Sequence, residues 1–411
     1  MNVTGDYATH EMDSCCQSNS VTLTYAEALK VLATHCQQIS PRNEKIALEN
    51  AARRILANSI FLDRDEPPVA RSAMDGFAVL IDDSITCRQI IATNYAGDAG
   101  QVHLEAGQAV KVMTGASVPI NAEAVVMVEH CQVNGDQLTI DGLPHKSNIR
   151  AIGALAHAGA LALAAGQTIS AGEMATIASC GVSEVDVYCQ PRVAIVSTGD
   201  EIVAYAGKVL AHQTRDSNRL MLQQQLKDFG AEVVSSVHVA DNPQALETAV
   251  DTATQLADVV ITIGGVSMGD KDYLPQVFQD LSVERLFHKI AIRPGKPIYV
   301  GYRQQTLVVG LPGNPVSSYV GAILFVRPII DAFSGDFQRR CTPQMSVAGA
   351  QFKSKARHDF VVAQFAPDSR VVATPSSGSA DWRSLATTQV LALVPPNAVI
   401  EAGQPIMTLP V

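Results

Sequence analysis

The sequence predicts a multidomain protein in which a three-layer α/β domain is combined with two β domains, one inserted and one C-terminal. Buried-strand patterns alternate with helical patterns over residues 191–337, which is typical of a parallel sheet covered by helices on both faces. Short β-like runs separated by glycines occupy residues 61–159, and β-like runs with turn residues return over residues 338–411. The 411 residues are enough for two to four such domains.

The N-terminal part of the chain is expected to be helical. Residues 1–20 are polar and are predicted to be a disordered leader. Thr24-Tyr-Ala-Glu27 is a capping box, which predicts a helix start. A second helix is expected from about Lys45 to Asn58 because its apolar residues recur at helical spacing. Residues 21–60 and 160–190 are therefore predicted to form a helical linking domain.

The inserted β domain is predicted from three runs that have strand character. They are VKVMTG (110–115), AVVMVEHCQV (124–133) and QLTID (137–141). Asn134-Gly135 between the last two runs is a strong hairpin signal.

The α/β domain is predicted from four buried strands with helices between them. The strands are VAIVST (193–198), EVVSSVHV (232–239), DVVITIGG (258–265) and LVVG (307–310), and the helices are 217–230 and 243–256. After the last strand, Asn314 is a good N-cap and Pro315 a good first helical residue. A glycine loop before a helix start suits an anion, but on this stretch alone a tight strand-to-helix turn of any α/β domain is the better explanation.

Composition excludes several classes of protein. The chain is 47% hydrophobic and 17% charged, with a net charge of -10, which argues against a general nucleic-acid binder. The eight cysteines show no C-x-x-C pair and favour reduced, mostly buried thiols. The first twenty residues have no signal-peptide pattern, and the apolar stretches are short and interrupted. We therefore expect a cytoplasmic protein with no nucleic-acid or membrane partner.

Ligands of open α/β sheets gather at the carboxyl ends of the strands, and five predicted loops at these ends carry ligand-type residues. Glycines allow close backbone approach at Gly264, Gly265 and Gly313. The loops also hold the carboxylates Glu201, Asp241 and Asp272 and the cations Arg293 and Lys296. This combination fits a phosphorylated or nucleotide ligand with Mg²⁺, although any one of these carboxylates taken alone is better explained as a helix cap or a solvated loop. No dinucleotide fingerprint, P-loop or nucleophile elbow is present.

A set of motifs resembles the molybdopterin molybdotransferases, the bacterial MoeA family related to the C-terminal domain of gephyrin. The likeness covers roughly residues 21–411. The motifs are SAMDGFAV (72–79), MTGASVP (113–119), VAIVSTGDEIV (193–203), DSNRLML (216–222), DVVITIGGVSMGDKDY (258–273), AIRPGKPIYVG (291–301), GLPGNPVS (310–317) and SSGSADWRSLATTQVLALVP (376–395).

The resemblance implies a function in molybdenum cofactor biosynthesis. Such an enzyme inserts molybdenum from molybdate into adenylylated molybdopterin and releases AMP, with Mg²⁺. It also implies a homodimer, and as partners the adenylylating molybdopterin-binding protein and the molybdoenzymes that accept the cofactor. The implied catalytic positions are Asp75, Thr114, Glu201, Asp241 and Asp272, the last three also holding metal. The implied substrate-binding positions are Gly264, Gly265, Ser267, Lys289, Arg293, Lys296, Pro312, Gly313, Asn314 and Pro315.

Three departures from the family pattern bear on activity. The family's usual Gly-Glu-Asp is Gly153-Ala154-Leu155 here, so two carboxylates are missing. Its Asp-Asn before the SAMDG motif is Ala70-Arg71, and the first lysine of Lys-Pro-Gly-Lys-Pro is Arg293. One alternative is therefore a non-catalytic or weakly active paralogue that binds molybdopterin or its molybdenum cofactor as a carrier or scaffold. Another is a related enzyme, such as a nucleotide hydrolase or a variant specific for tungstate.

Overall fold

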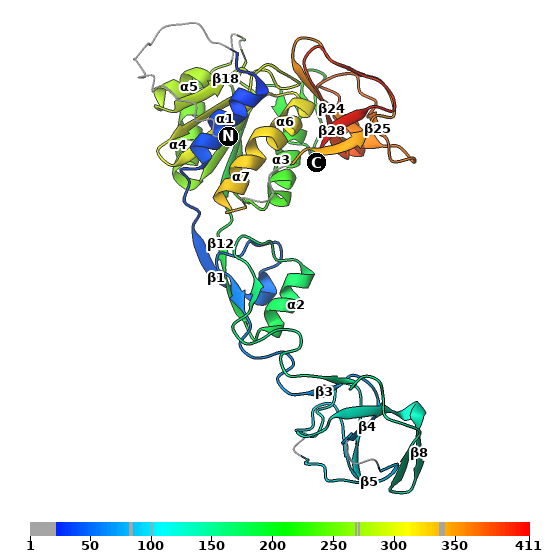
Figure 1. Cartoon of the computed structure of the whole chain (residues 1–411). Coiled ribbons are helices and arrows are strands. Elements are labelled where there is room, and N and C mark those ends of the chain that lie inside the picture. Colours follow the sequence, from blue (N-terminus) through cyan, green and yellow to red (C-terminus); the bar gives the residue numbers. More distant parts are fainter. Residues whose placement is uncertain (1–21, 82–84, 100–101, 268, 270–271, 337–341) are drawn as a thin grey trace, which may run out of the picture. The chain divides into compact units, whose positions relative to one another are not determined.

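The computed structural model describes residues 22–81, 85–99, 102–267, 269, 272–336 and 342–411, and it divides into two compact units (Figure 1). The α/β unit comprises the chain up to Arg42 and Cys189–Val411, and the insert unit comprises Asn43–Tyr188. The peptide N–H of Cys189 donates to the carbonyl of Arg42 at 2.8 Å, so the chain leaves and re-enters the α/β unit at neighbouring points. The expected leader, residues 1–20, lies outside the described residues.

A six-stranded sheet forms the centre of the α/β unit, in the order β16-β13-β17-β21-β20-β18. Strands β16, β13, β17 and β21 are parallel, whereas β20 and β18 are antiparallel. The bounds are β13 Arg192–Thr198, β16 Glu232–Val239, β17 Val259–Ile263, β18 Glu284–His288, β20 Tyr299–Arg303 and β21 Thr306–Leu311. All four strands predicted for this domain are confirmed.

Helices cover both faces of this sheet, because alternate side chains of a strand point to opposite faces. In β13, Val193 and Ile195 pack with α1, α3, α6 and α7, whereas Ala194 and Val196 pack with α4 and α5. The helix bounds are α1 Tyr25–Cys36, α3 Ser217–Asp228, α4 Pro243–Leu256, α5 Leu274–Asp280, α6 Pro315–Gly321 and α7 Arg327–Phe333. The predicted three-layer arrangement is confirmed.

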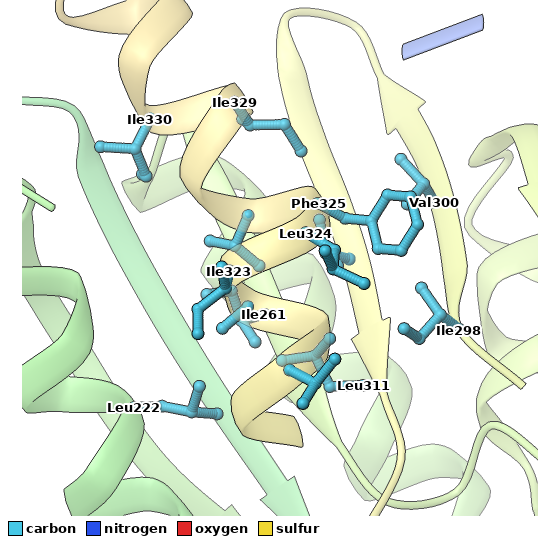
Figure 2. Packing of buried hydrophobic residues seen from close by; sticks show 14 of the residues in the cluster. Leu222, Ile261, Ile298, Val300, Leu311, Ile323, Leu324, Phe325, Ile329 and Ile330 are labelled. Atoms are coloured by element: carbon cyan, nitrogen blue, oxygen red, sulfur yellow. The ribbon is translucent and has the colours of Figure 1, made fainter. Parts of the chain in front are cut away.

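A long apolar run, Pro315–Phe333, is a core element of the α/β unit. Helix α6, a π-helical segment Ala322–Val326 and α7 form one run of 19 residues, and its side chains interdigitate with the strands (Figure 2). By length and composition it is long and apolar enough to cross a bilayer, so the expectation that the apolar stretches are short and interrupted, with no span of membrane length, is wrong here. Its burial, 72% of its most apolar window, accounts for that composition.

The C-terminal β sheet is fused to the α/β core. Its strands are β19 Ile292–Arg293, β22 Gln344–Val347, β24 His358–Phe365, β25 Val371–Ala373, β26 Val390–Val394 and β28 Pro405–Pro410, with the short pair β23 Phe352–Lys353 and β27 Val399–Ile400 beside them. Phe360, Leu391 and Leu409 from this sheet belong to the same buried cluster as α1 and α7. A 3₁₀ turn, Trp382–Thr387, precedes β26.

Helix α1 begins at the predicted capping box, in which Thr24 and Glu27 satisfy each other's backbone N–H groups. Its contacts place it with the α/β unit, so the predicted grouping of residues 21–60 with 160–190 is wrong for this helix. Short strands β14 Ile202–Val203 and β15 Thr214–Arg215 also belong to this unit.

The insert unit contains two sets of elements. The first has β1 Asn43–Ala47 paired with β12 Glu184–Tyr188, β2 Ile60–Phe61 paired with β11 Leu161–Leu163, and α2 Ala171–Ser179. The second is a six-stranded sheet, β7-β4-β6-β5-β9-β8, with the pair β3 Arg71–Ser72 and β10 Ile149–Arg150. Its bounds are β4 Gly76–Val79, β5 Cys87–Asn94, β6 Gln108–Val112, β7 Ala124–Met127, β8 Cys131–Asn134 and β9 Gln137–Ile140.

Two sequence-based predictions for this part have clear outcomes. The Asn134-Gly135 hairpin is confirmed, since Asn134 pairs with Gln137 across the turn. The helix expected from Lys45 to Asn58 is wrong: the segment forms β1, a 3₁₀ turn Leu48–Asn50 and bridges from Ile55 and Leu56. The backbone groups of this segment bond to residues more than a hundred positions away, and this pairing overrides the local helical spacing.

The described cysteines are Cys36, Cys87, Cys131, Cys180 and Cys189, and all five are free thiols, as expected. Only Cys180 among them is buried, so the expectation of mostly buried thiols is wrong for this set.

Candidate active site

A cleft of about 1120 Å³ lies in the α/β unit at the carboxyl ends of its parallel strands. This is larger than the roughly 300–1,000 Å³ of pockets that hold drug-sized ligands, and it suits a longer ligand. Residues that follow β13, β15, β16, β17 and β21 line it, as the strand-end argument predicted. They include Glu201, Asp241, Gly264, Gly265, Ser267, Asp272, Pro312, Gly313, Asn314 and Pro315. Ten of the sequence-predicted site residues therefore lie in one place.

The glycine pair after β17 has a backbone conformation that other residues rarely adopt, with φ +86° at Gly264 and +64° at Gly265. A Cβ on Gly264 would lie 3.1 Å from the carbonyl oxygen of Thr198, and one on Gly265 would lie 3.2 Å from Leu274. The N–H of Gly264 donates to the carbonyl of Leu311 at 3.0 Å, which ties this turn to β21. The backbone at Gly264 and Gly265, which carry no side chain, is thus held in place at the cleft.

The loop Pro312–Pro315 leads into α6 and is held by neighbouring segments. Asn314 occupies the N-cap position, but its side chain donates to Ser379 Oγ at 3.1 Å instead of accepting from the helix. The Val316 N–H donates to the carbonyl of Ser379 at 3.0 Å. The Asn218 side chain donates to the carbonyl of Gly313 at 2.6 Å. The first free donor of α6 is therefore occupied by the C-terminal segment, and the loop serves as a wall of the cleft.

Two carboxylates of the cleft are fixed by short hydrogen bonds. Asp241 accepts from the Thr198 hydroxyl at 2.6 Å, and it exchanges backbone-to-carboxylate bonds with Asp200 at 3.1 and 3.3 Å. Asp272 accepts from the Gly269 N–H at 2.6 Å. Glu201 is exposed at the cleft. Both aspartates keep oxygen lone pairs for a further partner.

Magnesium fits this cleft only as a jointly held ion. Among the residues that the structure describes, no three His, Cys, Asp or Glu side chains converge to hold a metal, so Glu201, Asp241 and Asp272 do not form a cage. Mg²⁺ is usually bound by one or two carboxylates together with substrate phosphates and water. The separated carboxylates Asp241 and Asp272 match that mode of binding.

The cations predicted from sequence are not in the described lining of the cleft. Arg293 pairs with the buried Asp359 of β24, its partner across the β19–β24 ladder. Burial raises the pKa of Asp359, and Arg293 opposes that rise. Lys296 is exposed and Lys289 is half-buried. Their predicted role in substrate binding stays a prediction.

Arg215 is the cation that does line the described cleft, and it is not among the residues predicted from the sequence. Its Nε and Nη2 each donate to a carbonyl at 3.2 Å, of Tyr205 and Gly207, which fixes the guanidinium and leaves its other N–H groups available. The signal in the sequence was its place directly before Asp216, the N-cap of α3. Asp216 is buried in an ion pair with Arg219 at 2.8 Å, which is a structural role.

Asp75 and Thr114 lie in the insert unit and form a hydrogen-bonded pair. The Thr114 N–H and hydroxyl donate to Asp75 Oδ1 at 2.6 and 2.8 Å, and they hold the pKa of this carboxyl below its usual range. Arg71 donates to the carbonyl of Gly115 at 3.2 Å in the same turn. Leu155, in the position where the resembling family has a carboxylate, is 67% exposed.

Comparisons with known proteins agree with the fold. A model described as "MoeA N-terminal region (domain I and II)" matches residues 23–181, and one described as "probable molybdopterin binding domain" matches residues 194–332. A molybdopterin molybdenumtransferase of Haemophilus influenzae is 35% identical over 326 residues, 78% of this chain and 80% of the relative. One from Synechococcus elongatus is 29% identical over 93% of this chain and 98% of the relative.

Solved structures show the same relationship. The crystal structure of a molybdopterin biosynthesis MoeA protein from Pyrococcus horikoshii matches with a TM-score of 0.82 and 25% identity, covering 95% of this chain and 99% of that one. Sequence relatives and structural relatives thus coincide. The chain belongs to the molybdopterin molybdenumtransferase family, a family of transferases that includes MoeA.

Proposed function

We propose that this protein inserts molybdenum from molybdate into adenylylated molybdopterin and releases AMP, in a reaction that depends on Mg²⁺. The observation that carries the proposal is the single cleft in which glycine backbone, two hydrogen-bonded aspartates and Arg215 meet at the strand ends. The family to which the chain belongs supports the reaction class. The cleft volume of about 1120 Å³ is suited to a ligand with both a pterin and a nucleotide part.

Each group in the cleft has a chemical task in this reaction. The exposed backbone at Gly264 and Gly265 allows close approach of the ligand's phosphates. Arg215 presents a fixed guanidinium to phosphate oxygens. Asp241 and Asp272 would hold Mg²⁺ against the phosphates, and the ion when bound would polarise the phosphoanhydride that breaks as AMP leaves. Holding these anions in register lowers the entropic cost of reaction.

Further parts of the proposal come from the family resemblance. They are a homodimer in the cytoplasm, catalytic participation of Asp75, Thr114 and Glu201, and anion binding by Lys289, Arg293 and Lys296. The adenylylating molybdopterin-binding protein would supply the substrate, and molybdoenzymes would accept the product.

The test is molybdate-dependent AMP release from adenylylated molybdopterin by the purified protein with Mg²⁺. We expect AMP release that stops when molybdate is omitted or Mg²⁺ is chelated. Release of AMP without molybdate would instead indicate a hydrolase, and a preference for tungstate would indicate a different oxyanion.

A second candidate, a carrier or scaffold that binds molybdopterin without turnover, is favoured by one observation: Leu155 is an exposed apolar residue in place of a carboxylate. Loss of one carboxylate can lower a rate by orders of magnitude. Assaying Leu155→Asp beside the wild type separates the candidates. Activity gained only in the variant, with ligand binding retained in both, would favour the carrier.

A further inference from the structure

The cleft has one feature to which the proposed chemistry gives no task. Trp382, the only tryptophan of the chain, lines the cleft with 63% of its surface exposed. It is also the one aromatic side chain in the described lining. An indole of this exposure contributes little to a core, because burial of apolar area is what stabilises a fold. A tryptophan on a cleft wall presents a flat face to whatever the cleft holds.

The turn that carries Trp382 is rigidly built. The preceding residue, Asp381, has a side chain only 6% exposed, and it accepts bonds from Arg383 at 2.8 and 3.1 Å and from the Ser377 N–H and hydroxyl at 2.9 and 3.0 Å. These donors hold the pKa of Asp381 well below its usual range, so the carboxylate stays charged. The 3₁₀ turn then begins at Trp382 itself. The backbone on both sides of the indole is therefore fixed.

The same segment is attached to the other wall of the cleft. Ser379 accepts from the Val316 N–H at 3.0 Å and from the Asn314 side chain at 3.1 Å. The indole is thus positioned relative to the loop Pro312–Pro315, although it comes from the C-terminal β part of the chain. A preorganised aromatic face beside a phosphate-type cleft is the arrangement on which planar heterocycles stack.

We propose that Trp382 is the stacking surface for the heteroaromatic ring of the ligand, and so contributes to its binding and not to the bond-breaking step. This inference rests on the proposed function for the identity of the ring, which is either the pterin or the adenine of adenylylated molybdopterin. Stacking on an aromatic side chain typically changes affinity by about 5- to 150-fold on substitution with alanine.

The first experiment uses Trp382 as its own reporter, because no other tryptophan contributes to the emission. Wild-type protein is titrated with AMP, with a free pterin and with ribose 5-phosphate, which has no ring. We expect saturable change in tryptophan fluorescence lifetime with AMP or with the pterin, and none with ribose 5-phosphate. Whichever of the two compounds, AMP or the pterin, changes the fluorescence lifetime identifies the ring that stacks on Trp382. An equal response to ribose 5-phosphate, or no response to either ring, would overturn the proposal.

The second experiment compares variants by calorimetric titration with the ring compound that acts. Trp382→Ala should raise the Kd about 5- to 150-fold, and Trp382→Phe, which keeps a ring, should recover most of the affinity. Phe365→Ala removes another exposed aromatic side chain, which lies on β24 and outside the cleft lining, and should leave the Kd unchanged. Wild-type affinity in Trp382→Ala would refute the stacking role.

Turnover distinguishes this inference from the proposed function. In an active wild type, Trp382→Ala should raise KM for adenylylated molybdopterin with little change in kcat. If the wild type binds a ring with a fluorescence response but releases no AMP, the proposed reaction fails while the stacking site stands.

Discussion

The cleft of the α/β unit and the Asp75–Thr114 turn of the insert unit are both assigned to one reaction, but they are built in different ways. The cleft collects residues from seven chain segments, several of which follow parallel strands that end at one edge of the sheet. The turn is a local arrangement in which the carboxylate of Asp75 is satisfied by Thr114 alone. Two of the three departures from the family pattern, Ala70-Arg71 and Ala154-Leu155, fall in the insert unit. The cleft therefore depends on the packing of a whole sheet, whereas the Asp75 carboxylate is held by hydrogen bonds from one residue.

The largest expected effect tests whether the two units unfold independently of each other. Phe325 in the α/β unit and Phe77 in the insert unit are both fully buried. Replacing either with alanine should lower the free energy of unfolding of its own unit by about 3–5 kcal/mol. Scanning calorimetry should show Phe325→Ala lowering one transition and Phe77→Ala another. A single transition shifted by both substitutions would mean that the units unfold as one, and the comparison would fail.

The next effect concerns the carboxylates of the cleft. Asp241→Asn and Asp272→Asn keep the shape of the side chain but remove the charge available to Mg²⁺. We expect each to lower kcat for molybdate-dependent AMP release at least about 100-fold, because metal polarisation supplies several kcal/mol of transition-state stabilisation. Asp228→Asn, at the exposed end of α3, is the matched control and should keep the wild-type rate. A fully active Asp272→Asn enzyme would remove this residue from the site.

The third prediction tests whether Arg215 binds the anionic part of the substrate in the cleft. Arg215→Ala should raise KM for adenylylated molybdopterin about 10- to 150-fold, because hydrogen bonds to charged groups are worth about 1.5–3 kcal/mol. Arg215→Lys keeps the charge but lacks the planar guanidinium, so its KM should lie between those of the wild type and Arg215→Ala. Arg370→Ala removes an exposed arginine outside the cleft and serves as the control. An unchanged KM in Arg215→Ala would return the anion-binding role to Lys289, Arg293 and Lys296.

The smallest effect concerns the turn of the insert unit. The Thr114 N–H and hydroxyl lower the pKa of Asp75, so this carboxylate stabilises the folded state above its unfolded pKa, and the stabilisation is lost as pH falls through the folded pKa. Thr114→Val removes the hydroxyl only and should move the pKa of Asp75 part of the way back toward its usual range. Carboxyl NMR titration of isotope-labelled aspartate measures this shift. Thr114→Ser keeps both donors and should leave the pKa in place, so a shift there would point to another cause.

The sequence predicted best those elements that depend on local signals and on sheet topology. Strand β16 and helix α4 have the expected bounds, and the strand-end rule brought Asp241, Asp272 and the glycine loops into one cleft. It failed where pairing across long distances decides the structure. The segment from Lys45 to Asn58 has helical spacing but pairs with residues near 185, and Arg293 meets Asp359 through strand register. Trp382 and Arg215 reach the cleft from segments whose positions only the folded chain defines.

The hydrogen bond between Cys189 and Arg42 places the two ends of the inserted segment next to each other. A chain that departs and returns at one point can gain, lose or exchange the intervening stretch without breaking the sheet that remains. The Asn43–Tyr188 segment is in this sense an insertion, and the residues that flank it are joined by one backbone hydrogen bond. A short glycine linker would therefore join Arg42 directly to Cys189. The remaining chain would hold the α/β sheet and all described residues that line the cleft, because none of them comes from the insert unit.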